Sequence, residues 1–245
     1  MARNAKEEVA SASRILAALG VVDAFGHVSR RAPGATGRFL MSRSLAPARV
    51  RAQDVLTLDL DARAVDDPGA RLFLERFIHA EIFRKRPDIG AVVHAHSRAV
   101  LPFTIVPGIR VRPACHVCGF LAGLTEPFDL AHHAGDGTDL LISNAEHGRM
   151  LARHLGSASV ALMRGHGFTA VGSTIQEAVF RAVYTVHNCE IQRNAIGLGA
   201  PVYLTDAEAA ACDRTTAGQA NRAWDLWVEQ AERAHSSGTA HFVED

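Results

Sequence analysis

The chain has few cysteines, few aromatic residues and no net charge. Its 245 residues include four cysteines, and Phe, Trp and Tyr make up 6% of the sequence. Four scattered cysteines are too few for a disulfide framework in a chain of this length. The 26 acidic and 26 basic residues cancel, so no overall basic field exists that would attract nucleic acid. We therefore expect no nucleic-acid partner.

Long hydrophobic runs are also absent. No run approaches the roughly 20 residues that a membrane-spanning helix needs, and the first eight residues lack the apolar stretch of a secretory signal. Apolar residues make up 48% of the chain and charged residues 21%. This balance is typical of a globular protein with a sizeable core. We expect a cytoplasmic protein with no membrane partner.

Two of the cysteines lie close together, in Cys115-His116-Val117-Cys118. This CxxC spacing occurs in zinc half-sites and in redox pairs. Because no second CxxC follows, we favour small buried cysteines in a reducing compartment.

Local patterns predict a mixed α/β chain. Ser173 and Thr205 each start a capping box, which marks a helix N-terminus. Gly20, Pro87 and Gly156 end the other predicted helices. Helices are predicted over residues 6–19, from about 72 to 86 and between the last two strands; strands are predicted within 21–60, at 89–93, near 139–142 and at 159–163. The expected fold is a central sheet with covering helices and a helical C-terminus.

Three histidines lie where strands end. In His94-Ala95-His96 the alternate residues of a strand point to one face, so both imidazoles can reach one ion. His166 lies between Gly165 and Gly167, which let the backbone bend sharply and approach a ligand closely. Such histidines also occur as ordinary polar residues or on surface turns, and the pattern leaves that alternative open.

A carboxylate precedes the first histidine strand. Glu75 falls within the helix predicted from about residue 72, and His79 follows four residues later on the same helical face. A carboxylate close to a metal can act as a ligand or as a general base. Periodicity alone favours a solvated surface charge at Glu75.

In combination, these segments resemble the class II aldolase/adducin family. The matching residues are Glu75, His79, the His94-Ala95-His96 motif and Arg164-Gly165-His166-Gly167, and the resemblance extends from Ser11 to about Leu204. It implies an αβα sandwich around a mostly antiparallel sheet, formed by residues 1–245 as a single domain with a helical extension at about 206–245. It also implies one divalent ion per subunit, held by His94, His96, His166 and Glu75, and commonly a homotetramer with interface active sites.

The chain departs from the sugar-phosphate aldolases of that family at their phosphate-binding segments. It has Gly26-His27-Val28-Ser29 where they have a Gly-Asn loop, Ser42-Arg43-Ser44 where they have small residues, and Phe73-Leu74 where they have two serines. Phosphate binding needs several amides and hydroxyls, so these changes argue against a phosphosugar.

A flat aromatic acid fits these replacements better. The fork of Arg43 matches a carboxylate, and Phe73 and Leu74 suit a ring. We therefore predict that the substrate is bound by His27, Ser29, Ser42, Arg43 and Ser44; the alternative for Arg43 is a surface loop residue.

Segments 23–29, 39–44, 74–79 and 116–121 resemble the decarboxylase branch of the family, which includes 3,4-dihydroxyphthalate decarboxylase and 3-hydroxy-2-methylpyridine-4,5-dicarboxylate decarboxylase. The resemblance implies a carbon-carbon lyase: a divalent-metal-dependent, non-oxidative decarboxylase of a hydroxylated aromatic ortho-dicarboxylate such as 3,4-dihydroxyphthalate. Three histidines and a carboxylate suit Zn, Mn, Fe or Co. The resemblance favours Mn.

Three residues are candidates for proton transfer. Glu75 serves as a fourth ligand or as a proton carrier. His116 lies close to where the family's aldolases place a tyrosine from a neighbouring subunit, so we predict that it donates a proton across the interface, with His79 as the competing donor. A buried structural role is the alternative for His116. The segment 223–227 is expected to pack one of its two tryptophans, Trp224 or Trp227, in the core or at an interface.

Two other functions remain open. One is a class II aldolase or epimerase acting on a small hydroxy-carbonyl compound. The other is a non-catalytic adducin-like assembly module, and the four retained ligands argue against it because a scaffold does not need them.

Overall fold

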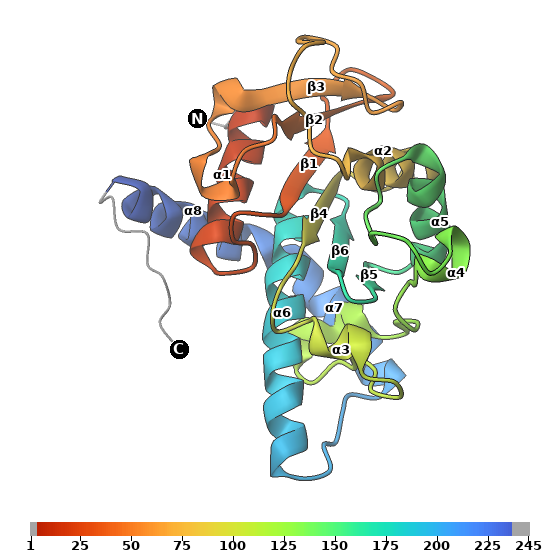
Figure 1. Cartoon of the computed structure of the whole chain (residues 1–245). Coiled ribbons are helices and arrows are strands. Elements are labelled where there is room, and N and C mark those ends of the chain that lie inside the picture. Colours follow the sequence, from red (N-terminus) through yellow and green to blue (C-terminus); the bar gives the residue numbers. More distant parts are fainter. Residues whose placement is uncertain (1–3, 237–245) are drawn as a thin grey trace.

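Six short strands form one sheet in the computed structural model, which describes residues 4–236 (Figure 1). The strand order is β3-β2-β1-β4-β6-β5, and every neighbouring pair is antiparallel. This confirms the predicted α/β class with an antiparallel central sheet. The strands are β1 His27–Arg31, β2 Arg38–Ser42, β3 Val55–Asp59, β4 Ala91–Ala95, β5 Val160–Met163 and β6 Gly167–Gly172.

Both faces of the sheet are buried, because alternate residues of a strand enter different cores. On β4, Ala91, Val93 and Ala95 belong to one hydrophobic cluster, whereas Val92 belongs to the other. Two-sided burial explains why this strand is a continuous apolar run. His94 and His96 share the parity of Val92, so they lie on the second face.

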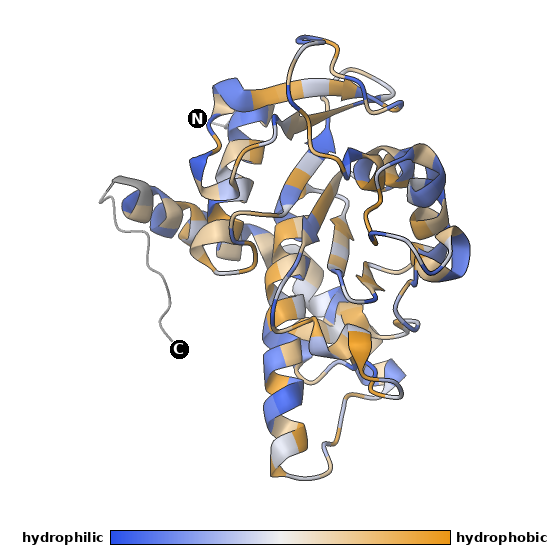
Figure 2. Ribbon diagram, in the orientation of Figure 1, coloured by the Kyte–Doolittle hydropathy of each residue, from blue (hydrophilic) through white to orange (hydrophobic). Residues whose placement is uncertain are grey.

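Each face is covered by its own helices. The first cluster contains side chains of α1 (Ala5–Ala18), α6 (Ile175–Leu198) and α8 (Ala220–Ser236). The second contains side chains of α2 (Arg76–Lys85) and α5 (Ala145–Leu155). Hydrophilic and hydrophobic residues alternate along these helices, as expected of amphipathic helices that cover a sheet (Figure 2).

The remaining elements are short or C-terminal. They are α3 Pro102–Ile105, α4 Ala131–Ala134, α7 Asp206–Thr216 and the 3₁₀ helices η1 Pro47–Arg49, η2 Ala52–Asp54, η3 His116–Leu121 and η4 Ala217–Gln219. The expected C-terminal extension is helical in α7 and α8, and residues 237–245 lie outside the described residues. Both Trp224 and Trp227 are buried, where only one was expected to be. None of the helices within residues 4–236 is both long and apolar enough to span a membrane.

The predicted helix from about residue 72 begins only at Arg76, so Glu75 is its N-cap rather than a helical residue. Backbone carbonyls that a longer helix would use have other donors. The Arg71 carbonyl accepts from the Ser44 N–H, and the Phe73 carbonyl accepts from the Arg76 guanidinium. These tertiary hydrogen bonds hold residues 71–75 outside the helix.

The prediction of a strand near residues 139–142 is wrong. This segment is irregular, and Leu140 has a positive φ of 64°. The Leu140 carbonyl and the Ile142 N–H bond to the side chains of His166 and Glu75 instead of to a neighbouring strand. The segment therefore orients two candidate ligands through hydrogen bonds.

The other predicted helix boundaries agree with the structure to within one residue. Gly20 follows α1 with a positive φ, α5 ends before Gly156, and Thr205 forms the predicted capping box. At the start of α6 the cap is Thr174, one residue after the predicted Ser173, because the Thr174 hydroxyl accepts from the Glu177 N–H.

All four cysteines are free thiols. Cys118 is buried as expected, whereas Cys115 is only partly buried, with the two sulfur atoms 3.2 Å apart.

Candidate metal centre

Two ligands come from the end of β4. His94 is fully buried and lies opposite Thr169 of β6. His96 follows the strand, and its side chain is 31% exposed. Because residues two apart on a strand point to one face, their Nε2 atoms meet, 2.9 Å apart. The exposed edge of His96 leaves the pair accessible from outside.

The third ligand comes from the turn between β5 and β6. The His166 N–H donates to the Met163 carbonyl, and Gly165 adopts a φ of 62°, which favours glycine. A Cβ on Gly167 would lie 2.2 Å from the Ala95 carbonyl oxygen. The two glycines therefore allow the turn to approach β4 closely, and His166 Nε2 lies 3.0 Å from His96 Nε2.

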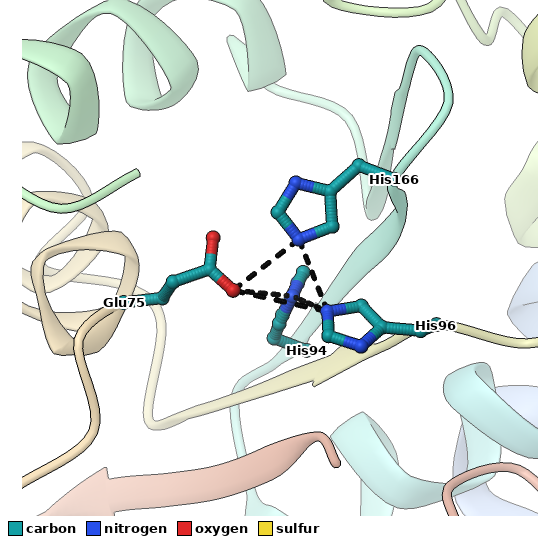
Figure 3. Close-up of side chains that lie close together, drawn as sticks. All are labelled: Glu75, His94, His96 and His166. Atoms are coloured by element: carbon teal, nitrogen blue, oxygen red, sulfur yellow. Dashed lines mark hydrogen bonds and ion pairs between the residues drawn. The ribbon is translucent and has the colours of Figure 1, made fainter. Parts of the chain in front are cut away.

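Glu75 completes the group from the N-terminus of α2 (Figure 3). Its Oε1 accepts a hydrogen bond of 3.0 Å from the Ile142 N–H, which orients Oε2 toward the histidines. Oε2 lies 3.2 Å from His166 Nε2, 3.4 Å from His94 Nε2 and 3.8 Å from His96 Nε2. The four predicted ligands are therefore brought together.

The spacing of these atoms fits a single divalent ion. All four candidate ligand atoms lie within 4.8 Å of one another. Ligands about 2.0–2.1 Å from a tetrahedral ion are about 3.3 Å apart, close to most of the separations observed.

The partners of the outer ring nitrogens also fit metal binding. His166 Nδ1 donates to the Leu140 carbonyl at 2.9 Å, so in the neutral imidazole Nε2 carries the lone pair that a metal ion would use, and His94 Nδ1 is 3.4 Å from Thr169 Oγ1. Such partners orient a metal-binding imidazole. Leu140, Ile142 and Thr169 were not predicted from the sequence. Thr169 carried a signal, because it is a polar residue in the otherwise apolar strand β6.

The electrostatics favour a cation at this position. Burial raises the pKa of Glu75, but His94 and the hydrogen-bonded His166 outweigh it and hold that pKa below its usual range. Burial lowers the pKa of His94 to about 4, against the charge of Glu75. Burial also lowers the pKa of His166, but Glu75 reverses this and raises it above the ordinary value. The carboxylate is thus ionised and His94 is neutral, which are the forms that bind metals.

His27 and His79 lie behind this cluster. His27 of β1 is paired with His94 of β4, and the ring centroids are 5.1 Å apart. His27 Nδ1 is 2.7 Å from His79 Nε2, and His79 Nδ1 is 2.6 Å from Ser29 Oγ. Burial is the main cause that lowers the pKa of His79 to about 3 and that of His27 well below its ordinary value. His79 is fully buried, so it faces the core rather than the open side of the cluster.

The other predicted substrate-binding residues surround the end of β2. Ser42 is buried, and the Arg43 and Ser44 N–H groups donate to the carbonyls of Asp54 and Arg71. The Arg43 side chain is 43% exposed, and its Nε is 3.5 Å from Asp54 Oδ1. Among the described residues, Asp54 is thus the acidic partner of this guanidinium. A role of Arg43 in carboxylate binding stays a prediction.

His116 does not belong to the group of candidate metal ligands. It is exposed on η3, where it lines a cavity of about 510 Å³ together with Tyr184, Arg222 and Trp227. The alternative of a buried structural histidine is therefore wrong. Its predicted role across a subunit interface stays a prediction.

Comparison with known proteins places the whole arrangement in one family. Residues 7–193 match the Class II Aldolase and Adducin N-terminal domain. The chain is 39% identical to decarboxylase tropJ of Talaromyces stipitatus, with the match covering 86% of this chain and 88% of the relative. It is 30% identical to a 3,4-dihydroxyphthalate decarboxylase of Arthrobacter keyseri, with coverage of 84% and 85%.

The fold has close structural neighbours as well. An aldolase II superfamily protein from Pseudomonas syringae superposes with a TM-score of 0.78 at 22% identity, over 94% of this chain and 92% of the neighbour. An L-fuculose 1-phosphate aldolase from Glaciozyma antarctica gives 0.77 at 21% identity, over 95% and 90%. These likenesses support the fold, and the sequence match fixes the membership: the chain belongs to the class II aldolase and adducin family.

Proposed function

We propose that this protein is a divalent-metal-dependent, non-oxidative decarboxylase of a hydroxylated aromatic ortho-dicarboxylate such as 3,4-dihydroxyphthalate. The observation that carries the proposal is the convergence of His94, His96, His166 and Glu75 on one point. Relatives that are named decarboxylases, at 39% and 30% identity, support a lyase of this type.

The surroundings of the cluster suit a flat ring. The Phe25 ring lies 6.5 Å from the His96 ring and is 67% exposed, and Leu74, next to Glu75, is 64% exposed. The Phe73 ring packs 4.7 Å from the His27 ring. Apolar groups beside a few polar ones are typical of sites for small organic ligands. We infer that these side chains contact the ring while polar groups bind its oxygen atoms.

The reaction needs a charge stabiliser and a proton donor. When bound, a divalent ion acts as a Lewis acid that stabilises the negative charge released by carbon-carbon cleavage. In the proposed step the bond from a ring carbon to its carboxyl carbon breaks, carbon dioxide leaves, and that ring carbon gains one proton. No oxidant is consumed. His27 and the Ser42-Arg43-Ser44 segment hold the substrate oxygens, and orientation of this kind lowers the barrier.

His116 of a neighbouring subunit is our proposed proton donor. Within one chain His116 lines a separate cavity, so this role requires the homotetramer with interface active sites that the proposal includes. A histidine suits the task because histidine is the side chain that most often transfers protons in enzymes. If His116→Phe lowers decarboxylation while leaving metal content unchanged, the role is supported; unchanged activity contradicts it.

The main test is carbon dioxide release from 3,4-dihydroxyphthalate by the Mn-reconstituted protein. We expect release by the wild type, loss of release in His94→Ala, and unchanged release in His132→Ala, a matched control because the His132 side chain is 80% exposed. Release that persists in His94→Ala would refute the metal-dependent reading.

The same metal cluster also suits an aldolase or epimerase, because a Lewis acid can polarise a carbonyl. That function predicts aldehyde formation from a hydroxy-carbonyl compound without carbon dioxide. Metal affinity separates both enzymes from an assembly module. A purified protein without affinity for Mn²⁺ or Zn²⁺ would argue against both.

A further inference from the structure

A buried row of hydrogen-bonded polar side chains runs from Ser29 through His79 to His27. Ser29 and His79 are fully buried, whereas His27 is 6% exposed. Within residues 4–236, the fully buried side-chain nitrogens and oxygens that lack a hydrogen-bond partner are Glu8 Oε2 and Arg43 Nε, and each of these forms an ion pair instead. His27 Nε2 also has no hydrogen-bond partner among these residues, but it is not among the fully buried atoms. This nitrogen is therefore accessible, at the open end of the row.

Few arrangements of hydrogens are possible on these three side chains. A fully buried imidazole without a carboxylate partner is neutral, so His79 carries one N–H. The 2.7 Å contact between His79 Nε2 and His27 Nδ1 needs a hydrogen on one of the two nitrogens. This leaves two arrangements, in which all hydrogen bonds point either toward His27 or toward Ser29.

The Ser29 hydroxyl distinguishes these arrangements. Among the described residues its Oγ has a single partner, His79 Nδ1 at 2.6 Å. If His79 donated to Ser29, the buried hydroxyl hydrogen would have no acceptor, and a buried donor without a partner is costly. If Ser29 donates to His79 Nδ1, every buried donor is satisfied. His79 Nε2–H then donates to His27 Nδ1, and the hydrogen of His27 is on Nε2.

We propose that Ser29 and His79 are positioning residues that fix His27 as a neutral Nε2–H donor, and that His27 binds an anionic oxygen of the substrate. The oxygen-binding part rests on the function proposed above. Because His27 lies opposite His94 and its ring packs on Phe73, its open edge is beside the metal cluster. This assigns His79 a role behind His27, in place of proton donation to the substrate.

The tautomer is tested directly by neutron diffraction from crystals of the Zn-loaded protein exchanged into D₂O. The expected result is deuterium on Nε2 of both His79 and His27, with none on either Nδ1. Deuterium on His27 Nδ1 would overturn the assignment. This measurement needs no substrate, so it stands apart from the success or failure of the proposed decarboxylation.

The donor role is tested with phthalate, an unreactive aromatic ortho-dicarboxylate, by calorimetry on the Mn-loaded protein. His27→Gln, whose amide nitrogen reaches the position of the imidazole Nε2, keeps an N–H donor and is expected to bind within about threefold of wild type, whereas His27→Phe loses the donor and is expected to bind at least about tenfold more weakly. Metal content and melting temperature are checked for each variant. Phthalate binding by His27→Phe at wild-type strength overturns the donor role.

The positioning role is tested one step further back. In His79→Gln the amide nitrogen can donate to His27 and the amide oxygen can accept from Ser29, so phthalate affinity is expected to stay within about threefold of wild type. In His79→Leu and Ser29→Ala the orientation is lost, and binding is expected to weaken about tenfold. A purely space-filling role predicts the opposite order for Gln and Leu, which would overturn the proposal.

Discussion

Replacement of Gly167 by alanine offers a sharp test of how the metal centre is built. Gly167 follows His166 and begins β6, directly beside the end of β4. A Cβ added there would lie 2.2 Å from the Ala95 carbonyl oxygen and 3.0 Å from His96 Cα. Both contacts are with backbone, so no side-chain rotation can relieve them.

The size of the effect follows from these distances. Cβ atoms essentially never approach another heavy atom within 3.0 Å, so β4 and β6 must separate by about 0.8 Å at this point. Overpacking of this kind costs about 1–3 kcal/mol, which lowers the melting temperature by roughly 2–12 °C in a chain of this size. His96 and His166 lie on opposite sides of the clash, and a displacement of about 1 Å in a reacting site can cost about 100-fold in rate.

Chelator competition and thermal unfolding measure both effects. We expect Gly167→Ala to bind Mn²⁺ or Zn²⁺ at least about tenfold more weakly, similar to the loss of an outer-shell partner. Gly137→Ala is the matched control, because nothing lies within 4 Å of the added Cβ. Wild-type metal affinity and melting temperature in Gly167→Ala would refute the argument that the close approach of β4 and β6 assembles the site.

Three further predictions concern groups around the cluster. His79 is neutral in the folded protein because burial lowers its pKa to about 3. In the unfolded chain its pKa is about 6.5, so the free energy of unfolding is unaffected by this group above pH 6.5 and decreases as the pH drops from there toward 3. At pH 5 the decrease is about 2 kcal/mol. Between pH 7.5 and 5, the melting temperature of His79→Gln should therefore fall by roughly 4–8 °C less than that of wild type, and equal falls would contradict this. Glu75→Gln keeps an oxygen for the Ile142 N–H but loses the negative charge. Chelator titration should therefore show metal affinity reduced by more than about 100-fold, a larger loss than is usual for residues that only hydrogen-bond to a ligand. A loss below about tenfold would rule out Glu75 as a ligand. Thr169→Val should weaken metal binding only about tenfold, because the contact with His94 is 3.4 Å long; a loss as large as that of Glu75→Gln would contradict this ranking.

The sequence was sufficient for those site residues whose placement depends on local geometry. His94 and His96 are two apart on a strand, and His166 lies between two glycines, so periodicity and turn chemistry predict their positions. The antiparallel αβα arrangement followed from the family resemblance. Its physical basis is visible in β4, where neighbouring residues enter different cores.

Positions that depend on tertiary hydrogen bonds were harder to predict. Glu75 and His79 were expected on one helical face, but α2 begins after Glu75, so a spacing of four does not place them together. Residues 139–142 were predicted as a strand. Their backbone groups are instead bonded to His166 and Glu75, which lie far away in sequence. Periodicity contains no information about such partners.

The hydrogen bond from the Ile142 N–H to Glu75 makes this amide a natural reporter of the metal centre. Amide hydrogen exchange requires the donor to leave its acceptor, so the Ile142 amide exchanges only when the 139–142 segment separates from Glu75. The Leu140 carbonyl in the same segment holds His166. One local opening event therefore releases the supports of two ligands from different elements, and its free energy can be measured at a single amide.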